Sequence, residues 1–241
     1  MPTINPMDDW TLKLSKRMTS KVKQDSFMHV SVLGERNYGK TYYSLKNMAL
    51  TLYKLNNVSE YEAWNTVLDY VVFTPSYFKR IVKDCRMNDY KVPFILLDDA
   101  GAHFDSGLHD RSRIQYQLLN TCLDTIKDVT NCLIVTCPFK DVLTKRLREY
   151  DGYDVTIYMD RGYERSCTCI KWYRLPTGDK RWNKEFEDKF SCYIPTPIHE
   201  QYLKIRNMFT LNHMDELDEL ERRQHLILNK KLKNLEKKQK G

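Results

Sequence analysis

The sequence predicts an α/β fold in which a parallel β-sheet is flanked by helices. Short apolar, β-rich runs alternate with amphipathic segments from residue 27 to residue 160. Two of the runs, 92–99 and 131–138, are apolar nearly throughout, which is typical of strands buried on both faces. Alternating strands and helices imply right-handed crossovers between parallel strands. Beyond residue 160 this alternation stops, and a C-terminal β-hairpin arm and a long helix are expected there.

Each element has its own signal in the sequence. Trp10, Leu14, Met18 and Val22 recur every four residues and predict an amphipathic helix over 8–24. The apolar runs predict strands at 27–33, 71–74, 92–99, 131–138 and 153–159. The segments between them predict helices at 40–55, 61–70, 75–85, 113–129 and 139–150. Proline at the first turn supports the helix that begins at Pro75.

The C-terminal third has a different character. The turn PTGD predicts a hairpin, and a long helix is expected over about 197–240. Gln224 and Lys231 interrupt a heptad there, so the helix is interpreted as a weak coiled-coil or docking helix; its leucines are Leu217, Leu220, Leu228, Leu232 and Leu235. The expected parts are an N-terminal amphipathic helix (1–26), a core of alternating strands and helices (27–160), the hairpin arm (161–196) and a C-terminal basic helix (197–241).

Composition limits the class of protein. The chain has 241 residues, 41% of them apolar, which indicates a globular protein with a substantial core. It has no apolar run long enough for a membrane span, and its first residues, MPTINPMDDW, do not have the pattern of a signal peptide. We therefore expect a cytoplasmic protein, in the host cytoplasm if the chain is viral.

The seven cysteines do not indicate a metal site or a disulfide scaffold. Their number is odd and no C-x-x-C spacing occurs. Cys167 and Cys169 are two residues apart, on one face of a predicted strand, and we expect them to be buried thiols.

The net charge of +7 is unevenly distributed. Two segments, 13–23 and 229–240, are strongly basic. Such runs suit a polyanion such as DNA, although a solvated helix face explains either run equally well.

The strongest motif is GERNYGKT, residues 34–41, which matches G-x-x-x-x-G-K-[ST]. It follows a predicted strand and opens a predicted helix, as a phosphate-binding loop must. Lys40 is expected to reach the β- and γ-phosphates, and Thr41 to place its hydroxyl on Mg²⁺. The residues expected to surround the nucleotide are Gly34, Glu35, Arg36, Asn37, Tyr38, Gly39, Lys40, Thr41 and Tyr42. The motif predicts a P-loop NTPase of the RecA/AAA+-like type.

Two carboxylates follow the apolar run 92–97. Adjacent buried carboxylates repel each other unless a cation holds them, so Asp98 is predicted to complete the Mg²⁺ site with Thr41. Asp99 stands where many ATPases have a glutamate that positions the attacking water, although an aspartate reaches less far. Thr136 ends the run 131–136 and is the candidate for contacting the γ-phosphate.

A cation that acts on the γ-phosphate, often from a neighbouring subunit, would complete such a site. Arg148 is the favoured residue, and the other candidates are Arg146, Arg111, Arg113 and Lys127. GTPases are excluded because the segment NKEF has phenylalanine where the guanine-binding motif has aspartate. Small-molecule kinases share the loop but usually lack the paired aspartates on a long apolar strand.

Four segments together resemble the small DnaA-like P-loop ATPases of archaeal spindle-shaped viruses (fuselloviruses) and related plasmids. They are GERNYGKTYYSLK, YEAWNTVLDYVVF, VPFILLDDAGAHF and NCLIVTCPFKDVLTKRLREYDGYDVTIYM, and they cover about residues 27–160. The resemblance implies ATP at the loop, metal at Thr41 and Asp98, water activation near Asp99 and γ-phosphate sensing at Thr136. It also favours Arg148. The departure is Thr136-Cys137-Pro138, where such proteins tend to have a second hydroxyl.

The leading hypothesis is an oligomeric ATPase that acts on viral or plasmid DNA as a replication initiator or helicase-loader-like factor, with a helicase or capsid component as a candidate partner. A genome-packaging motor that translocates duplex DNA would use the same site. An ATP-gated scaffold with negligible hydrolysis is the third alternative, because Asp99 is a short carboxylate.

Overall fold

The computed structural model describes residues 11–56, 58–160, 164–211, 214–215 and 222. The chain divides into two compact units, Met1–Ile198 and His199–Gly241. A helix begins at residue 196 and is described as far as residue 211. The leucines of the predicted coiled-coil helix and the basic run 229–240 lie outside the described residues.

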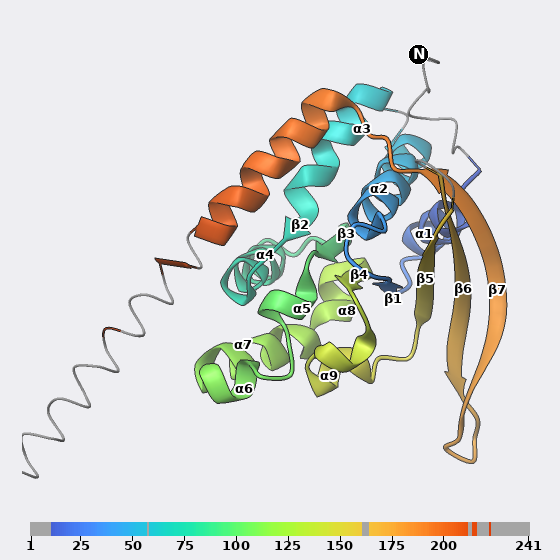
Figure 1. The fold of residues 1–241 in the computed structure, drawn as a ribbon. Helices are drawn as coiled ribbons and strands as arrows, with labels where there is room; N and C mark the ends of the chain where they lie inside the picture. The colour runs from blue at the N-terminus through green and yellow to red at the C-terminus, as the bar shows by residue number, and fades with distance from the viewer. Residues whose placement is uncertain (1–10, 57, 161–163, 212–213, 216–221, 223–241) are drawn as a thin grey trace, which may run out of the picture. The chain divides into compact units, whose positions relative to one another are not determined.

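The first unit alternates strands and helices (Figure 1). Its strands are β1 (Met28–Leu33), β2 (Val71–Val72), β3 (Val92–Leu97), β4 (Thr130–Cys137), β5 (Tyr153–Met159), β6 (Glu164–Arg174) and β7 (Lys180–Ser191). Its longer helices are α1 (Lys13–Lys23), α2 (Lys40–Asn56), α3 (Glu60–Val67), α4 (Pro75–Met87) and α7 (Arg113–Asp124). Shorter helical segments are η1 (Leu68–Tyr70), α5 (Ala100–His103), α6 (Leu108–Arg111), α8 (Ile126–Val129), η2 (Lys140–Val142) and α9 (Lys145–Arg148).

The strands form one sheet in the order β2-β3-β4-β1-β5-β6-β7. The first five in this order run parallel, and β6 and β7 add antiparallel strands beyond β5. β4 lies between β1 and β3, since Val32 pairs with Thr136 and Leu97 pairs with Val135. The carboxyl ends of β1, β3 and β4 therefore meet at one edge, where ligands bind in open α/β sheets.

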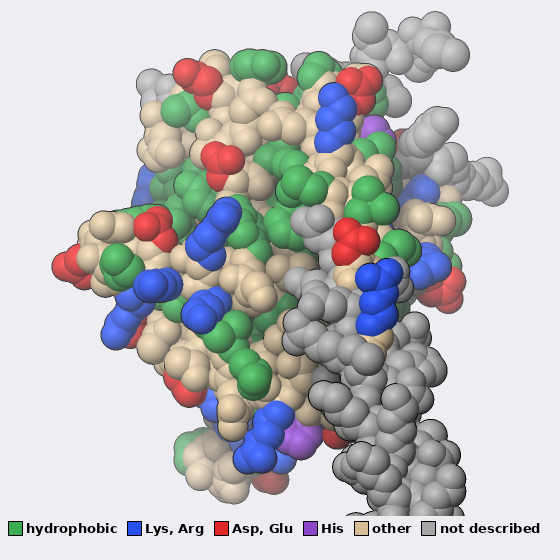
Figure 2. Space-filling view, turned by 90° about the vertical axis from the view of Figure 1, so that its left-hand side faces the viewer, with side chains coloured by type: hydrophobic (Ala, Val, Ile, Leu, Met, Phe, Trp, Pro, Cys, Tyr) green, Lys and Arg blue, Asp and Glu red, His purple; other side chains and the backbone are tan. Residues whose placement is uncertain are grey.

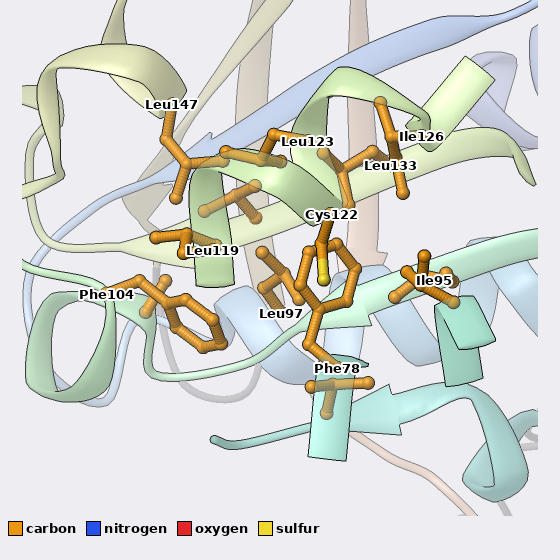
Figure 3. Packing of buried hydrophobic residues seen from close by; sticks show 14 of the residues in the cluster. Phe78, Ile95, Leu97, Phe104, Leu119, Cys122, Leu123, Ile126, Leu133 and Leu147 are labelled. Atoms are coloured by element: carbon orange, nitrogen blue, oxygen red, sulfur yellow. The ribbon is translucent and has the colours of Figure 1, made fainter. Parts of the chain in front are cut away.

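The main apolar core covers one face of β3 and β4. Alternate residues of these strands, Ile95 and Leu97 on β3 and Leu133 and Val135 on β4, point into it. Figure 3 shows these strands facing residues from the surrounding helices and from the turn after α5: Phe78, Phe104, Leu119, Cys122, Leu123, Ile126 and Leu147. Full burial of each large apolar side chain contributes about 1.5–3 kcal/mol, so this layer holds the sheet edge in place.

The opposite face of the sheet is covered by α1 and α2. These helices contact each other and β4, and Figure 1 shows them across the sheet from α5 and α8. Leu14 and Met18 of the predicted amphipathic pattern are fully buried, whereas Trp10 lies outside the described residues. Within the predicted helix 8–24, the observed helix α1 runs from Lys13 to Lys23.

Two short sequence signals fix the starts of α3 and α4. Ser59 and Glu62 form a reciprocal capping box at α3. The Thr74 hydroxyl accepts a hydrogen bond from the Tyr77 amide (3.3 Å), and Pro75 occupies the first turn of α4, as predicted. These local caps set where each helix begins before any packing is considered.

The continuous helix predicted over 139–150 is wrong. The structure has the short segments η2 and α9, separated by extended backbone at Leu143 and Thr144. The Thr144 amide donates to the Phe104 carbonyl (2.9 Å), and the Ser106 amide donates to the Val142 carbonyl (2.8 Å). Because these groups are paired with another segment, they are unavailable to a continuous helix.

The predicted hairpin forms and extends the main sheet. β6 pairs with β5 from Arg165 to Lys171, and β7 pairs with β6 along its whole length. Cys167 and Cys169 are buried on β6, which confirms the predicted buried thiols, and burial raises the pKa of Cys167 to about 12. Of the helices that the structure describes, none is sufficiently long and apolar to cross a bilayer.

Candidate nucleotide-binding site

The loop 34–39 connects the carboxyl end of β1 to the first residue of α2. Gly39 has φ +90°, and a Cβ atom there would lie 2.4 Å from the Cys192 sulfur. Gly34 has φ +149°, and its added Cβ would lie 3.1 Å from the Ile157 carbonyl oxygen. Both the backbone conformation and the space therefore require glycine. The N-terminal end of a helix such as α2 carries a partial positive charge, which favours an anion at this place.

Lys40 folds over the loop that precedes it. Its Nζ donates to the carbonyl oxygens of Gly34 and Glu35, at 2.7 Å in each case. Partial burial lowers the pKa of Lys40, and the carboxylates of Asp99 and Asp98 oppose this shift. An anion in the loop would favour the protonated form and offer a stronger acceptor than a carbonyl oxygen.

Thr41 and Asp98 meet at this edge of the sheet, as the metal-site prediction requires. The Thr41 hydroxyl lies 3.0 Å from Oδ1 and 3.3 Å from Oδ2 of Asp98. Asp98 is completely buried at the end of β3. A hydroxyl and a carboxylate are oxygen ligands of the kind that Mg²⁺ uses beside phosphate groups and water.

Thr136 connects the two aspartates. Its hydroxyl donates to Oδ1 of Asp98 at 2.6 Å and accepts the Asp99 amide at 2.9 Å. The side chain is completely buried. Thr136 therefore orients the aspartate pair, a role that the sequence did not reveal, and its contact with a γ-phosphate stays a prediction.

Asp99 adopts a left-handed backbone conformation (φ +49°, ψ +38°) at the start of α5. Such a conformation is uncommon outside glycine and is found preferentially at functional sites. The charge of the Asp99 carboxylate raises the pKa of Lys40, against the lowering by burial. The turn thus brings Asp99 to the loop side of the sheet edge.

Arg113, Arg146 and Arg148, three of the candidate cations, have exposed or partly exposed side chains. Arg148 is 4.0 Å from the Asp141 carboxylate, and Arg146 forms an ion pair with Asp124. Lys127 lies over the ring of Phe27. The structure thus brings together Lys40, Thr41, Asp98, Asp99 and Thr136, and the action of Arg148 on a neighbouring subunit's nucleotide stays a prediction.

Residues from the hairpin also line the loop, and the sequence did not indicate them. Arg165, at the start of β6, is 8% exposed, and its Cγ would lie 3.8 Å from a Cβ at Gly39. Cys192, directly after β7, contacts the same glycine. No local motif marks either residue, because Arg165 reaches the loop through the pairing of β6 with β5, and Cys192 through the pairing of β7 with β6.

The root of the hairpin is also tied to α2. The Tyr43 hydroxyl donates to Oδ2 of Asp188 (2.8 Å), and Lys46 Nζ donates to the Ser191 hydroxyl (2.8 Å). Burial raises the pKa of Tyr43 well above its usual value, so the hydroxyl stays protonated and keeps donating. The helix that begins at Lys40 is therefore fixed to β7.

Comparison with known proteins gives two relatives, both from archaeal viruses. The chain is 24% identical over 226 residues to an uncharacterised protein, B-251, of Sulfolobus spindle-shape virus 1, covering 88% of this chain and 86% of that protein. It is 29% identical over 85 residues to an uncharacterised protein, ORF286, of Acidianus two-tailed virus, covering 35% and 30%. No protein-family model matches the chain. These relatives agree with the viral part of the resemblance described above.

Among solved structures, the chain is similar to the N-terminal domain of zonular occludens toxin from Neisseria meningitidis, with TM-score 0.38, 10% identity and coverage of 73% of this chain and 98% of that one. It is also similar to the KaiC-like protein PH0186 from Pyrococcus horikoshii, with TM-score 0.33, 10% identity and coverage of 66% and 89%. The strand order, with the loop after β1 and β4 between β1 and β3, carries the fold assignment. The chain has a P-loop NTPase fold, as the sequence predicted.

Proposed function

We propose that this chain binds ATP with Mg²⁺ and hydrolyses it, and that it works as an oligomer on viral or plasmid DNA. The role that the DnaA-like resemblance favours is that of a replication initiator or helicase-loader-like factor. The nucleotide part of the proposal is supported above all by the contact between Thr41 and the buried Asp98 beside the loop that Lys40 covers. The relatives from archaeal viruses support a viral setting.

The donor set fits magnesium and a triphosphate. Amides of the loop and the ammonium group of Lys40 suit phosphate oxygens, and the Thr41 hydroxyl and Asp98 carboxylate suit Mg²⁺. When bound, Mg²⁺ would neutralise phosphate charge and polarise the phosphoryl oxygens.

The chain's own residues supply the remaining functions. Lys40 exchanges the carbonyl oxygens of Gly34 and Glu35 for phosphate oxygens, and so positions the nucleotide. Asp99 orients a water molecule and accepts its proton; its left-handed turn after β3 and its effect on the pKa of Lys40 support this role. Thr136 holds the backbone of Asp99 and the carboxylate of Asp98 in register.

The test measures binding of a fluorescent ATP analogue and steady-state phosphate release. Lys40→Ala and Asp98→Asn are expected to weaken binding at least tenfold, since each removes a charged contact worth about 1.5–3 kcal/mol, and to abolish phosphate release. Lys83→Ala, which removes an exposed lysine of α4, is the matched control and should behave as wild type. Unchanged binding and turnover in Lys40→Ala would refute the proposed site.

An ATP-gated scaffold with negligible hydrolysis is the second candidate. It is favoured by the Thr136 hydroxyl, which is engaged with both aspartates, and by the short side chain at Asp99. Tight binding of the analogue without phosphate release, with or without DNA, would select the scaffold. Release above the level of the Lys40→Ala variant would select the hydrolase.

A further inference from the structure

The far end of the hairpin extends past the rest of the sheet. β5 pairs with β6 no further than Tyr153, opposite Lys171, whereas β6 and β7 continue to pair as far as Arg174 and Lys180. Figure 1 shows this end of the hairpin reaching beyond β5. We call residues 171–184 the ribbon. Along most of its length it is a two-stranded antiparallel structure.

The ribbon is basic and carries an exposed tryptophan. It contains five basic side chains and one acidic side chain, and all of its residues are described: the basic ones are Lys171, Arg174, Lys180, Arg181 and Lys184, and the acidic one is Asp179. Trp172 and Trp182 are a directly opposed cross-strand pair. Trp172 is anchored by a hydrogen bond from its Nε1 to Asp154 (2.7 Å), whereas Trp182 is 56% exposed.

Contacts of the ribbon hold it in place and neutralise part of its charge, since Lys184 forms an ion pair with Glu187. Arg174 and Lys180 share one carboxylate, that of Asp151, at 2.9 Å and 3.3 Å. Two cations against one anion leave a positive charge, and Arg181 adds another at the next position of β7. The shared carboxylate fixes the angle at which the ribbon leaves the sheet.

The other described basic segment, 13–23, is partly engaged with the hairpin. On α1, Lys13 donates to the Glu187 carbonyl, and Arg17 forms an ion pair with Glu185, so these two cations face β7. On the face seen in Figure 2, basic side chains lie in separate groups among acidic and hydrophobic ones. The ribbon therefore concentrates positive charge on a projecting element.

We propose that the ribbon contacts duplex DNA, with its two strands in the major groove and its cations against the phosphates. The major groove is wide enough for a two-stranded β-ribbon, and Lys and Arg contacts to phosphate supply most of the affinity. The proposal deepens the DNA part of the proposed function and rests on it. The root of the same two strands meets the loop at Gly39 and the helix α2 at Tyr43 and Lys46, so one hairpin joins the nucleotide site to the DNA.

The test measures binding of a labelled duplex of about 30 base pairs by fluorescence anisotropy, over a range of salt concentrations, with the full chain. The variant Arg181→Ala/Lys184→Ala is expected to weaken binding about tenfold or more and to reduce the slope of log affinity against log salt by about two, one for each lost phosphate contact. Trp182→Ala is expected to weaken binding with little change in that slope. Exposed Lys83 and Tyr61 provide the controls Lys83→Ala and Tyr61→Ala, which should match wild type.

Each other outcome has a distinct meaning. If wild type binds the duplex and the ribbon variants bind it with the same affinity and the same salt slope, the ribbon proposal alone is overturned. A single strand of the same length that binds tighter than the duplex also overturns it, because a groove is then not required. Absence of duplex binding by wild type overturns both this proposal and the DNA part of the proposed function. Binding of the fluorescent ATP analogue, measured on the same samples, shows separately whether the nucleotide site is intact.

Discussion

Replacing Thr136 by valine tests the central contact of the site. Valine keeps the shape of threonine but removes the hydroxyl, which donates to Oδ1 of Asp98 (2.6 Å) and accepts the Asp99 amide (2.9 Å). A hydrogen bond to a charged group contributes about 1.5–3 kcal/mol, and a buried amide that loses its acceptor costs about 1–3 kcal/mol. The substitution removes both bonds at once, because they share one hydroxyl. We therefore expect the free energy of unfolding to fall by about 3 kcal/mol.

Urea and thermal unfolding followed by circular dichroism measure this loss. For a chain of this size, 1 kcal/mol corresponds to about 2–4 °C in Tm, so Tm should fall by roughly 6–12 °C. Thr136→Ser is the matched control: it keeps the hydroxyl and loses only a methyl group, which costs about 1 kcal/mol. The reasoning fails if Thr136→Val unfolds within about 0.5 kcal/mol of wild type, or if the serine variant is equally destabilised.

Three further predictions concern the loop, the hairpin root and the interior. Gly39→Ala should lower stability by about 1–3 kcal/mol in urea unfolding, because the added Cβ would lie 2.4 Å from the Cys192 sulfur at φ +90°; wild-type stability would contradict the loop geometry. Asp188→Ala and Tyr43→Phe should couple by about 1 kcal/mol or more in a double-mutant cycle, since they share a 2.8 Å hydrogen bond; strict additivity would contradict that bond. Burial lowers the pKa of His29 to about 3 from 6.5, so below pH 6.5 the unfolded chain takes up a proton that the folded chain does not. The stabilisation is therefore lost as the pH falls from 6.5 towards 3, by about 2 kcal/mol at pH 5; a His29→Phe variant should lack this part of the pH dependence, and identical dependence in both proteins would refute it.

Much of the site could be predicted because its parts are local in the sequence. The loop 34–41 can be recognised from the sequence by two glycines, a lysine and a threonine at fixed spacing. The glycines allow the backbone conformation of the loop, and the lysine and threonine supply its chemistry. Asp98 could be placed beside Thr41 because both follow parallel strands, whose carboxyl ends share one edge. The position of β4 between β1 and β3 comes from the structure.

Other features depend on contacts that no short stretch encodes. The helix predicted over 139–150 fails because the backbone near Leu143 pairs with residues 104–106, which precede it by almost forty positions. The contacts of Thr136 with the two aspartates could not be predicted for a similar reason. A threonine at a strand end is ordinary, and only the final packing shows that its hydroxyl lies between two aspartates.

The amino-acid sequence alone determined the class of fold, the loop after the first strand and the identity of the acidic strand end. Hydrophobic periodicity and the conformational demands of glycine act over a few residues, so they can be interpreted without coordinates. Only the tertiary structure decided that the hairpin extends the main sheet, that Arg165 and Cys192 border the loop, and that a basic ribbon projects from the far end. These features depend on contacts between segments that are far apart in the sequence; Gly39 and Cys192, for example, are separated by more than a hundred residues. The strand pairing that brings such segments together is set by the packing of the whole sheet.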